Sequence, residues 1–275
     1  MKYQIQLIAE IGEELLEGPV FDTASSTLYF VSILGCRVYR FLPITKELNY
    51  IQLDSPTSCV FITRQFGIVA VAVSGFYVLD FDLQRAKKLL EVKLPKFLRY
   101  NDGILDARER FIIGTMGFPE VIENAGSLLS YTEGQVTTLV SGTTISNGIA
   151  FSRDSSKMYF IDTPTRTVKE YAYNIENGTC EYIREIIRFT GNGVPDGMDI
   201  DENGNLWVAE WGGYCVSVWN SVNGESVGQI HIPSENVTSV CFDNFRNLYV
   251  TAASSFVEGK EKGGCLYYVK MENDE

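Results

Sequence analysis

Short runs of apolar, β-prone residues alternate with polar turn clusters along the whole chain. A turn cluster such as "DTASS", "SRDSSK" or "DENG" precedes each of the runs "TLYFVS", "GIVAVAVS", "RFIIGTM", "KMYFIDT", "NLWVAEW" and "NLYVTAA". A second apolar strand, such as "RVYRF", "FYVLDF" or "CVSVW", follows each run. Helical periodicity is scarce. The pattern predicts an all-β chain built from successive hairpins.

One unit of this pattern recurs. Its copies begin at Glu17, Asn101, Ser146, Pro195 and Thr238, with a degenerate copy at Thr57. Gly103, Gly148 and Gly197 lie 45 and 49 residues apart, and Gly18 precedes Gly103 by 85 residues, or two units. Six units in this chain give about 46 residues each, a propeller-blade period of four strands.

We therefore predict an all-β, six-bladed β-propeller with four-stranded blades, formed by a single domain over residues 1–275. The N-terminal strand "YQIQLIAEI" is expected to pair with the C-terminal blade, which closes the ring and covers an exposed edge. A two-sheet sandwich is the alternative, but it does not explain one motif at one spacing.

Composition and net charge limit the classes of binding partner that the chain is expected to have. The chain is 45% hydrophobic and 21% charged, with a net charge of −12. This charge argues against nucleic acid and anionic membranes as partners and suits a cation or a neutral small molecule. The sequence suggests no secretory signal, membrane span or protein partner. The six cysteines are scattered without a C-x-x-C pair, so we expect thiols in a reducing compartment and a cytoplasmic protein.

Residues 199–210, "DIDENGNLWVAE", match the calcium-loop pattern of an EF-hand at every fixed position. The flanks contradict this interpretation, because "GMDI" and "LWVAEW" suit strands and not helices. Asp201, Asn203 and Gly204 also have a simpler explanation, since these residue types form hairpin turns. We predict a turn here.

The residue before the repeated glycine carries a side-chain oxygen in four units. These residues are Glu17, Asp102, Asn147 and Asp196. Equivalent positions of a propeller lie at one height around the axis, so the four oxygens would converge as ligands of a hard cation. The alternative is that they are turn residues, because Asn-Gly and Asp-Gly are common turn dipeptides.

Four longer motifs carry a family resemblance. "LLEGPVFD", "RYNDGILDARERFIIGTM", "SNGIAFSRDSSKMYFIDT" and "GVPDGMDIDENGNLWVAEWGG" resemble the regucalcin–gluconolactonase family, also called the senescence-marker-protein family. The match runs in order over nearly the whole chain. The resemblance implies a six-bladed propeller with one divalent cation in its channel, and lactone hydrolysis at that cation. Ca²⁺ is the expected cation, with Zn²⁺, Mg²⁺ or Mn²⁺ as alternatives.

By the family's motifs, Glu17, Asn147 and Asp196 would bind the cation, and Asp196 would also be the general base. Arg99 and Asn101 would contact the substrate. The chain departs from the family at Ser32, where an Asp is usual, and at "FDN" (residues 242–244), where F-G-G is usual. Glu120 is the nearest candidate for an acidic substrate contact. These departures leave the metal motif intact and put substrate identity in doubt.

The sequence disfavours the common catalytic alternative to a cation, a Ser-His-Asp triad. His231 is the only histidine, and there is no G-x-S-x-G elbow, so a Ser-His-Asp triad is disfavoured and His231 is interpreted as a structural strand residue. A bound cation can instead activate water and polarise an ester. Phe118, Trp211 and Tyr214 either line the mouth or pack within blades.

The predicted function is divalent-metal-dependent hydrolysis of a lactone, most simply a sugar lactone such as gluconolactone. One alternative is a non-catalytic, calcium-binding propeller that acts as a binding or regulatory module. Another is a different reaction on the same scaffold, such as phosphotriester or strictosidine-synthase-like chemistry, because a fold alone does not decide function.

Overall fold

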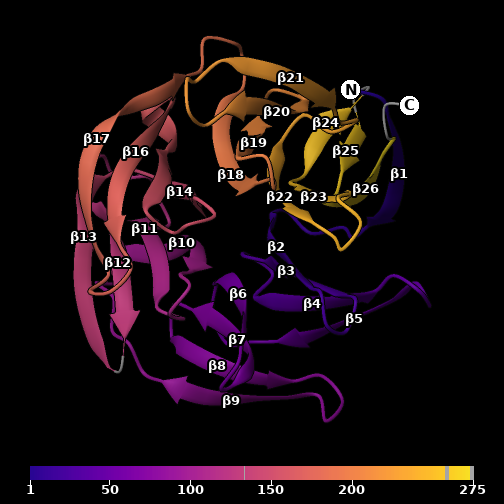
Figure 1. Ribbon diagram of the computed structural model, residues 1–275. Helices are drawn as coiled ribbons and strands as arrows, with labels where there is room; N and C mark the ends of the chain where they lie inside the picture. Colours follow the sequence, from indigo (N-terminus) through magenta and orange to yellow (C-terminus); the bar gives the residue numbers. More distant parts are fainter. Residues whose placement is uncertain (133, 258–259, 273–275) are drawn as a thin grey trace.

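Six four-stranded antiparallel sheets stand around a central axis, and the first and last strands of the chain pair in one of them (Figure 1). The computed structural model describes residues 1–132, 134–257 and 260–272. The predicted six-bladed propeller is confirmed, and so is closure of the ring through the N-terminal strand. Residues 133, 258–259 and 273–275 of the predicted 1–275 domain lie outside the described residues, and the single-domain assignment stays a prediction.

In the first three blades, the strands follow one another from the axis outward. Blade one contains β2 (Leu16–Asp22), β3 (Thr27–Ser32), β4 (Arg37–Leu42) and β5 (Glu47–Gln52). Blade two contains β6 (Thr57–Thr63), β7 (Gly67–Ala72), β8 (Gly75–Asp80) and β9 (Arg85–Leu90). Blade three contains β10 (Leu98–Leu105), β11 (Phe111–Gly117), β12 (Gly126–Thr132) and β13 (Gln135–Thr143).

Blades four and five repeat this order. Blade four contains β14 (Ser146–Phe151), β15 (Lys157–Asp162), β16 (Thr167–Asn174) and β17 (Thr179–Arg188), with the 3₁₀ turn η1 (Thr163–Thr165) between β15 and β16. Blade five contains β18 (Val194–Ile200), β19 (Asn205–Trp211), β20 (Cys215–Asn220) and β21 (Ser226–His231).

The sixth blade joins the two ends of the chain. It contains β22 (Val237–Phe242), β23 (Leu248–Ala252), β26 (Cys265–Met271) and, outermost, β1 (Tyr3–Glu10). A short hairpin of β24 (Ser255–Val257) and β25 (Lys260–Lys262) separates β23 from β26. Strand β1 pairs with β26 from Tyr3 opposite Met271 to Glu10 opposite Cys265. The last blade is therefore completed by the first strand, which covers the edge of β26.

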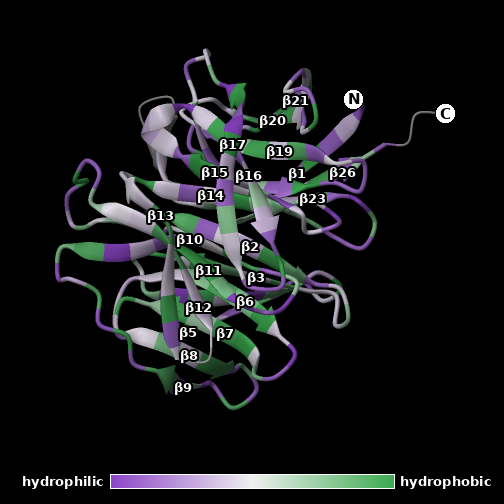
Figure 2. Cartoon of the chain, turned by 60° about the vertical axis from the view of Figure 1, so that its left-hand side comes forward, coloured by the Kyte–Doolittle hydropathy of each residue, from purple (hydrophilic) through white to green (hydrophobic). Residues whose placement is uncertain are grey.

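The inner strands β2, β6, β10, β14, β18 and β22 contact one another in cyclic order around the axis. In blades one and six, every residue of the second strand, β3 or β23, is buried. A neighbouring blade covers each of its faces, which explains continuous apolar runs such as "TLYFVS". Outer strands such as β9 are mostly exposed. Figure 2 shows hydrophobic residues along the strands and many hydrophilic residues in the loops.

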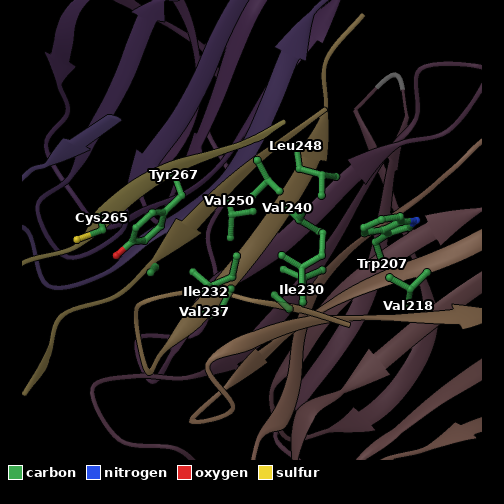
Figure 3. Close-up of a cluster of buried hydrophobic side chains, with 14 residues drawn as sticks. Trp207, Val218, Ile230, Ile232, Val237, Val240, Leu248, Val250, Cys265 and Tyr267 are labelled. Carbon is green, nitrogen blue, oxygen red and sulfur yellow. The ribbon is translucent and has the colours of Figure 1, made fainter. Parts of the chain in front are cut away.

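The core is divided into clusters between adjacent blades. Between blades five and six, Trp207, Val218 and Ile230 pack with Val240 and Leu248 (Figure 3). All five side chains are nearly inaccessible to water. Burial of a large aliphatic side chain stabilises a fold by about 1.5–3 kcal/mol. The cyclic packing of these clusters holds the inner strands, and the residues on them, at fixed positions.

One aspartate turn recurs at the far end of the inner strands. Asp201 Oδ1 accepts hydrogen bonds from the backbone N–H groups of Asn203 and Asn205, at 2.9 and 2.8 Å. Asp106 Oδ1 and Asp243 Oδ1 likewise accept hydrogen bonds from the backbone N–H groups of the residues two and four positions later. The predicted hairpin turn is confirmed, so residues 199–210 do not form an EF-hand loop.

Among the described residues, no helix is long and apolar enough to cross a membrane. No disulfide links the six cysteines in this part of the chain.

Candidate functional site

All six inner strands slip out of register with their second strand at the same level. In blade five, Pro195 lies opposite Glu210, but Met198 lies opposite Val208. The slip is equivalent in the other blades. One polar residue per blade falls at this level, always five residues before the residue that begins the hairpin turn: Glu17, Ser58, Asn101, Asn147, Asp196 and Thr238. We call these six residues the axial ring.

The register corrects one expectation. Aligning the repeats on their glycines put Asp102 level with Glu17, Asn147 and Asp196. In the structure Tyr100 lies opposite Thr115 and Gly103 lies opposite Ile113, so Asn101 occupies that level and Asp102 lies one residue further along the strand. Blade three has its glycine one residue later than blades one, four and five, so alignment on the glycine put Asp102 at the level that Asn101 occupies.

Hydrogen bonds between blades engage most of the axial ring. Thr238 Oγ1 donates to the Leu16 carbonyl at 2.6 Å, and Ser58 Oγ donates to the Tyr100 carbonyl. Asn101 Nδ2 donates to the Ser146 carbonyl at 3.0 Å. Asn147 Nδ2 donates to Asp196 Oδ1, in the next blade. Glu17 and Asp196 cannot donate in this way, because ionised carboxylates only accept hydrogen bonds.

Asn147 has an acceptor without a donor. Its Oδ1 atom is buried and has no hydrogen-bond partner among the described residues, whereas its Nδ2 is used twice, by Asp196 and by Thr163 Oγ1 at 3.1 Å. A buried carbonyl oxygen without a donor is costly unless something else satisfies it. Glu17 and Asp196 are only 7% and 4% exposed. Asp196 Oδ1 accepts from Asn147 and Glu17 Oε2 accepts from the Gly18 N–H at 3.2 Å, so Asn147 Oδ1 is the oxygen of this set that lacks a donor.

The charges of this site repel one another. Burial raises the pKa of Glu17 well above its ordinary value, and the charges of Asp196 and Asp102 raise it further. Burial, followed by the charge of Asp102, likewise raises the pKa of Asp196. Arg99 lowers both values, but less strongly. Three carboxylates therefore face a single guanidinium in a desolvated setting.

Arg99 is fixed beside the axial ring by its neighbours. Its Nη1 atom donates to the Tyr100 carbonyl at 2.8 Å and to Asn101 Oδ1 at 2.7 Å. Its guanidinium carbon lies 6.0 Å from the centroid of the Phe118 ring. Burial lowers the pKa of Arg99 to about 10, so it stays charged at neutral pH. Arg99 and Asn101 form one rigid unit through their hydrogen bond.

Other predicted residues lie apart from this constellation. Glu120 is exposed in the loop between β11 and β12, and no described hydrogen bond links its side chain to the axial ring. Trp211 and Tyr214 are each 37% exposed, and Tyr214 stacks on His231 with ring centroids 6.2 Å apart. Phe118 packs against Arg99. A role for Glu120, Trp211 or Tyr214 in binding substrate stays a prediction.

The departures from the family's pattern have local explanations. Ser32 lies opposite Leu16, next to Glu17, and its Oγ donates to Glu13 Oε2 at 2.9 Å. Glu13 also forms an ion pair with Arg37. A carboxylate therefore reaches this position from another residue. In "FDN", Asp243 makes the hairpin turn, and Asn244 Nδ2 donates to the Thr23 carbonyl at 3.0 Å.

A cavity of about 250 Å³ lies in the channel next to the axial ring, toward the hairpin turns. All six inner strands line it, and Asp102 and Asp199 are its carboxylates. A groove of about 490 Å³ lies between blades two and three, lined by Phe76, Phe111 and Tyr131 among others. It contains none of the predicted site residues.

The donor set fits a hard divalent cation. Within the described ranges, no group of three or more His, Cys, Asp or Glu side chains is placed to hold a metal ion unaided. An amide oxygen must therefore join the carboxylates, and Asn147 Oδ1 is without a partner. Carboxylate and amide oxygens are ligands that Ca²⁺ and Mg²⁺ prefer. Glu17, Asn147 and Asp196 could hold such an ion.

Fold and site together define a class of protein: a six-bladed propeller with buried carboxylates and amides on its axis. The chain belongs to the SMP-30/gluconolactonase/LRE-like family, whose pattern matches residues 15–254. It is 34% identical to pentonolactonase XacC of Haloferax volcanii, over 94% of this chain and 88% of that protein. It is 33% identical to regucalcin of Macaca fascicularis, over 91% of this chain and 86% of that one.

Comparison with a solved structure supports the same fold. The fold is similar to that of a luciferin-regenerating enzyme, with a TM-score of 0.89 and 29% identity over 98% of this chain and 96% of that one. The resemblance inferred from the sequence is thereby confirmed at the level of the family.

Proposed function

We propose that the protein is a divalent-metal-dependent hydrolase that opens the ester ring of a sugar lactone. The observation that carries the proposal is the buried, donorless Asn147 Oδ1 beside the buried carboxylates of Glu17 and Asp196, next to the fixed pair of Arg99 and Asn101. A purely structural ring would be expected to close its hydrogen bonds, as Ser58 and Thr238 do. Family membership and the lactonase names of relatives support the same conclusion.

Each residue has a defined task in this proposal. Glu17, Asn147 Oδ1 and Asp196 hold the cation, which supplies Lewis-acid polarisation and lowers the pKa of water when bound. Asp196 accepts the proton of the attacking water; it is a buried carboxylate whose Oδ1 is held by Asn147 Nδ2. The water oxygen bonds to the lactone carbonyl carbon, the ring C–O bond breaks, and the ring oxygen takes the proton that Asp196 accepted from the water. The product is a hydroxy acid.

Arg99 and Asn101 orient the substrate. The contact of Arg99 with Asn101 fixes the guanidinium without neutralising it, because its hydrogen-bond acceptors are a carbonyl and an amide. Its remaining N–H groups can bind sugar hydroxyls or the developing carboxylate. A fixed donor of this kind contributes through orientation, since it costs little entropy when substrate binds. A polyhydroxylated lactone matches these donors better than an apolar ester does.

A lactone panel tests the proposal. Proton release is measured with gluconolactone, pentonolactones and unsubstituted lactones, after chelation and after addition of Ca²⁺, Mg²⁺, Mn²⁺ or Zn²⁺. We expect hydrolysis of sugar lactones that chelation abolishes and at least one of the cations restores. Cation binding without turnover of any lactone would favour the non-catalytic calcium-binding alternative. Hydrolysis that survives chelation would contradict the metal-dependent proposal.

A further inference from the structure

Asp102 lies one residue beyond the axial ring, at a level where the other inner strands carry small residues. The register places it level with Gly18, Cys59, Gly148, Gly197 and Ser239. It therefore bears the only carboxylate at this level. Its side chain lines the channel cavity next to the axial ring. Asp102 Oδ1 accepts a hydrogen bond from the Gly103 N–H at 2.7 Å, and no described cation forms an ion pair with it.

This carboxylate acts on the axial ring through its charge. It is the charged group with the largest effect on Asp196, and it also acts on Glu17. The three carboxylates are not grouped tightly enough to hold one ion by themselves. Asp102 therefore interacts electrostatically with the cation position, but it is not one of the ligands.

The charges balance for one kind of occupant. When ionised, Glu17, Asp102 and Asp196 contribute three negative charges, and Arg99, whose pKa is about 10, contributes one positive charge. A divalent cation brings the total to zero, whereas a site without Asp102 would be left positive. Asn147 Oδ1, buried and without a donor, independently offers an acceptor to a cation at this position.

We propose that Asp102 is an outer carboxylate of the cation site, which tunes the site to a divalent ion by charge and not by coordination. The inference rests on the proposed cation site, but not on lactone turnover. It has a consequence for the reaction, because a hydroxy acid product carries a negative charge. In a site with no net charge, the product carboxylate is not held by excess positive charge and leaves more readily.

Asp199 provides a matched control. It lines the same cavity and is also a buried carboxylate, but it belongs to blade five and lies further along its strand. Its two oxygens accept hydrogen bonds from the N–H groups of Ile200 and Phe242, at 2.7 and 3.2 Å. The charge of Asp199 is not among the causes that shift the pKa of Glu17 or of Asp196.

The experiment compares Asp102→Asn, Asp199→Asn and wild type by titration calorimetry with Ca²⁺, Mg²⁺, Mn²⁺ and Zn²⁺, and by thermal unfolding with and without chelator. We expect Asp102→Asn to bind the preferred ion about 10–100-fold more weakly, the usual scale for a group that supports a metal from outside its ligands. The chelated variant should be at least as stable as chelated wild type, because a repulsive charge is gone. Asp199→Asn should bind that ion with wild-type affinity.

A merely structural role for Asp102 would instead lower stability with and without the ion. Asp102→Gly serves as a second variant, because three other inner strands carry glycine at this level, and it should show the same loss of affinity. Wild-type cation affinity in both Asp102→Asn and Asp102→Gly would overturn the role of Asp102 but leave the cation site standing. A loss of affinity in Asp199→Asn as large as that in Asp102→Asn would also overturn the role of Asp102. Failure of wild type to bind any of the four cations would overturn the cation site and this role together.

Discussion

At the scale of single residues, the site depends on which ring members can donate a hydrogen bond. Ser58, Asn101 and Thr238 satisfy carbonyls of adjacent blades, which stabilises the ring of strands. Glu17 and Asp196 cannot donate, so the polar belt around the axis is interrupted at two carboxylates. Such an interruption destabilises the empty fold, and a bound cation offsets it. Function and stability therefore conflict at these two residues.

Substituting Arg99 separates substrate binding from metal binding. Arg99→Ala should raise KM or lower kcat/KM, while cation affinity changes little, because a guanidinium binds oxygens but does not coordinate a cation. Steady-state kinetics on the best lactone and calorimetry with the preferred cation measure the two effects. A parallel loss of cation affinity would indicate that Arg99 mainly offsets the negative charge of Glu17 and Asp196.

Repeat position predicted Glu17, Asn147 and Asp196 correctly as equivalent residues, because each precedes a glycine at the same point of its unit. It failed for Asp102, since only strand pairing reveals that Asn101 occupies that level. The unpartnered Asn147 Oδ1 could not be predicted either. A sequence does not record which polar atoms of a buried belt find donors.

At the scale of elements, the same hairpin turn is built from different sequences. The fourth residue of the turn has a positive φ, with values of 61° at Glu109, 81° at Gly204 and 65° at Arg246. Glycine adopts this conformation most easily, but the aspartate hydrogen bonds impose it on the other two residues. The resemblance of residues 199–210 to a calcium loop follows from this turn chemistry, which also places an aspartate three residues before a positive-φ position.

The double variant Asp201→Ala, Glu210→Ala tests this interpretation. The number of cations bound should remain near one per chain, because the turn is not the cation site. Stability should fall by about 1–3 kcal/mol, the scale for leaving buried or partly buried donors without an acceptor. Asp201 Oδ2 also accepts the Trp207 Nε1–H at 3.0 Å, so tryptophan fluorescence should report the change. Loss of the cation with the fold retained in circular dichroism would restore the EF-hand hypothesis.

Apolar patterning predicted the second and third strands of the blades but was weaker for the outermost ones. Strand β3 is apolar and wholly buried, so its sequence stands out. Strand β9, "RAKKLL", is mostly exposed and charged because it forms the outer edge of its blade. The four strands per blade followed from the period of the repeat and not from four visible patterns.

At the scale of the whole molecule, closing six blades around one axis brings residues from distant parts of the chain into one desolvated channel. The acidic groups there shift together toward higher pKa. Burial raises the pKa of Asp102 to about 6, and it raises the pKa of Asp199 to about 6. A carboxyl with a raised pKa binds protons more tightly in the folded state. Its contribution to stability is therefore present at low pH and lost as pH rises through about 6.

Asp199→Asn isolates this effect, because its neighbours remain unchanged. Relative to wild type, the variant should gain stability as pH rises from about 4 to 7, by roughly 3 kcal/mol at most for a shift of this size. Urea unfolding in chelator at pH 4.5, 6 and 7.5 measures the difference. A stability difference that stays constant across these pH values would contradict the raised pKa.

The central claim concerns Asp196, as both cation ligand and general base. Asp196→Asn preserves size and one oxygen but removes a charge and the proton acceptor, so the most direct measurement is its lactone hydrolysis rate at saturating cation, with Asp199→Asn as the control. We predict a loss of roughly two orders of magnitude or more, the usual scale for a removed general base, together with weaker cation binding. Near-wild-type hydrolysis by Asp196→Asn at saturating cation would contradict the account.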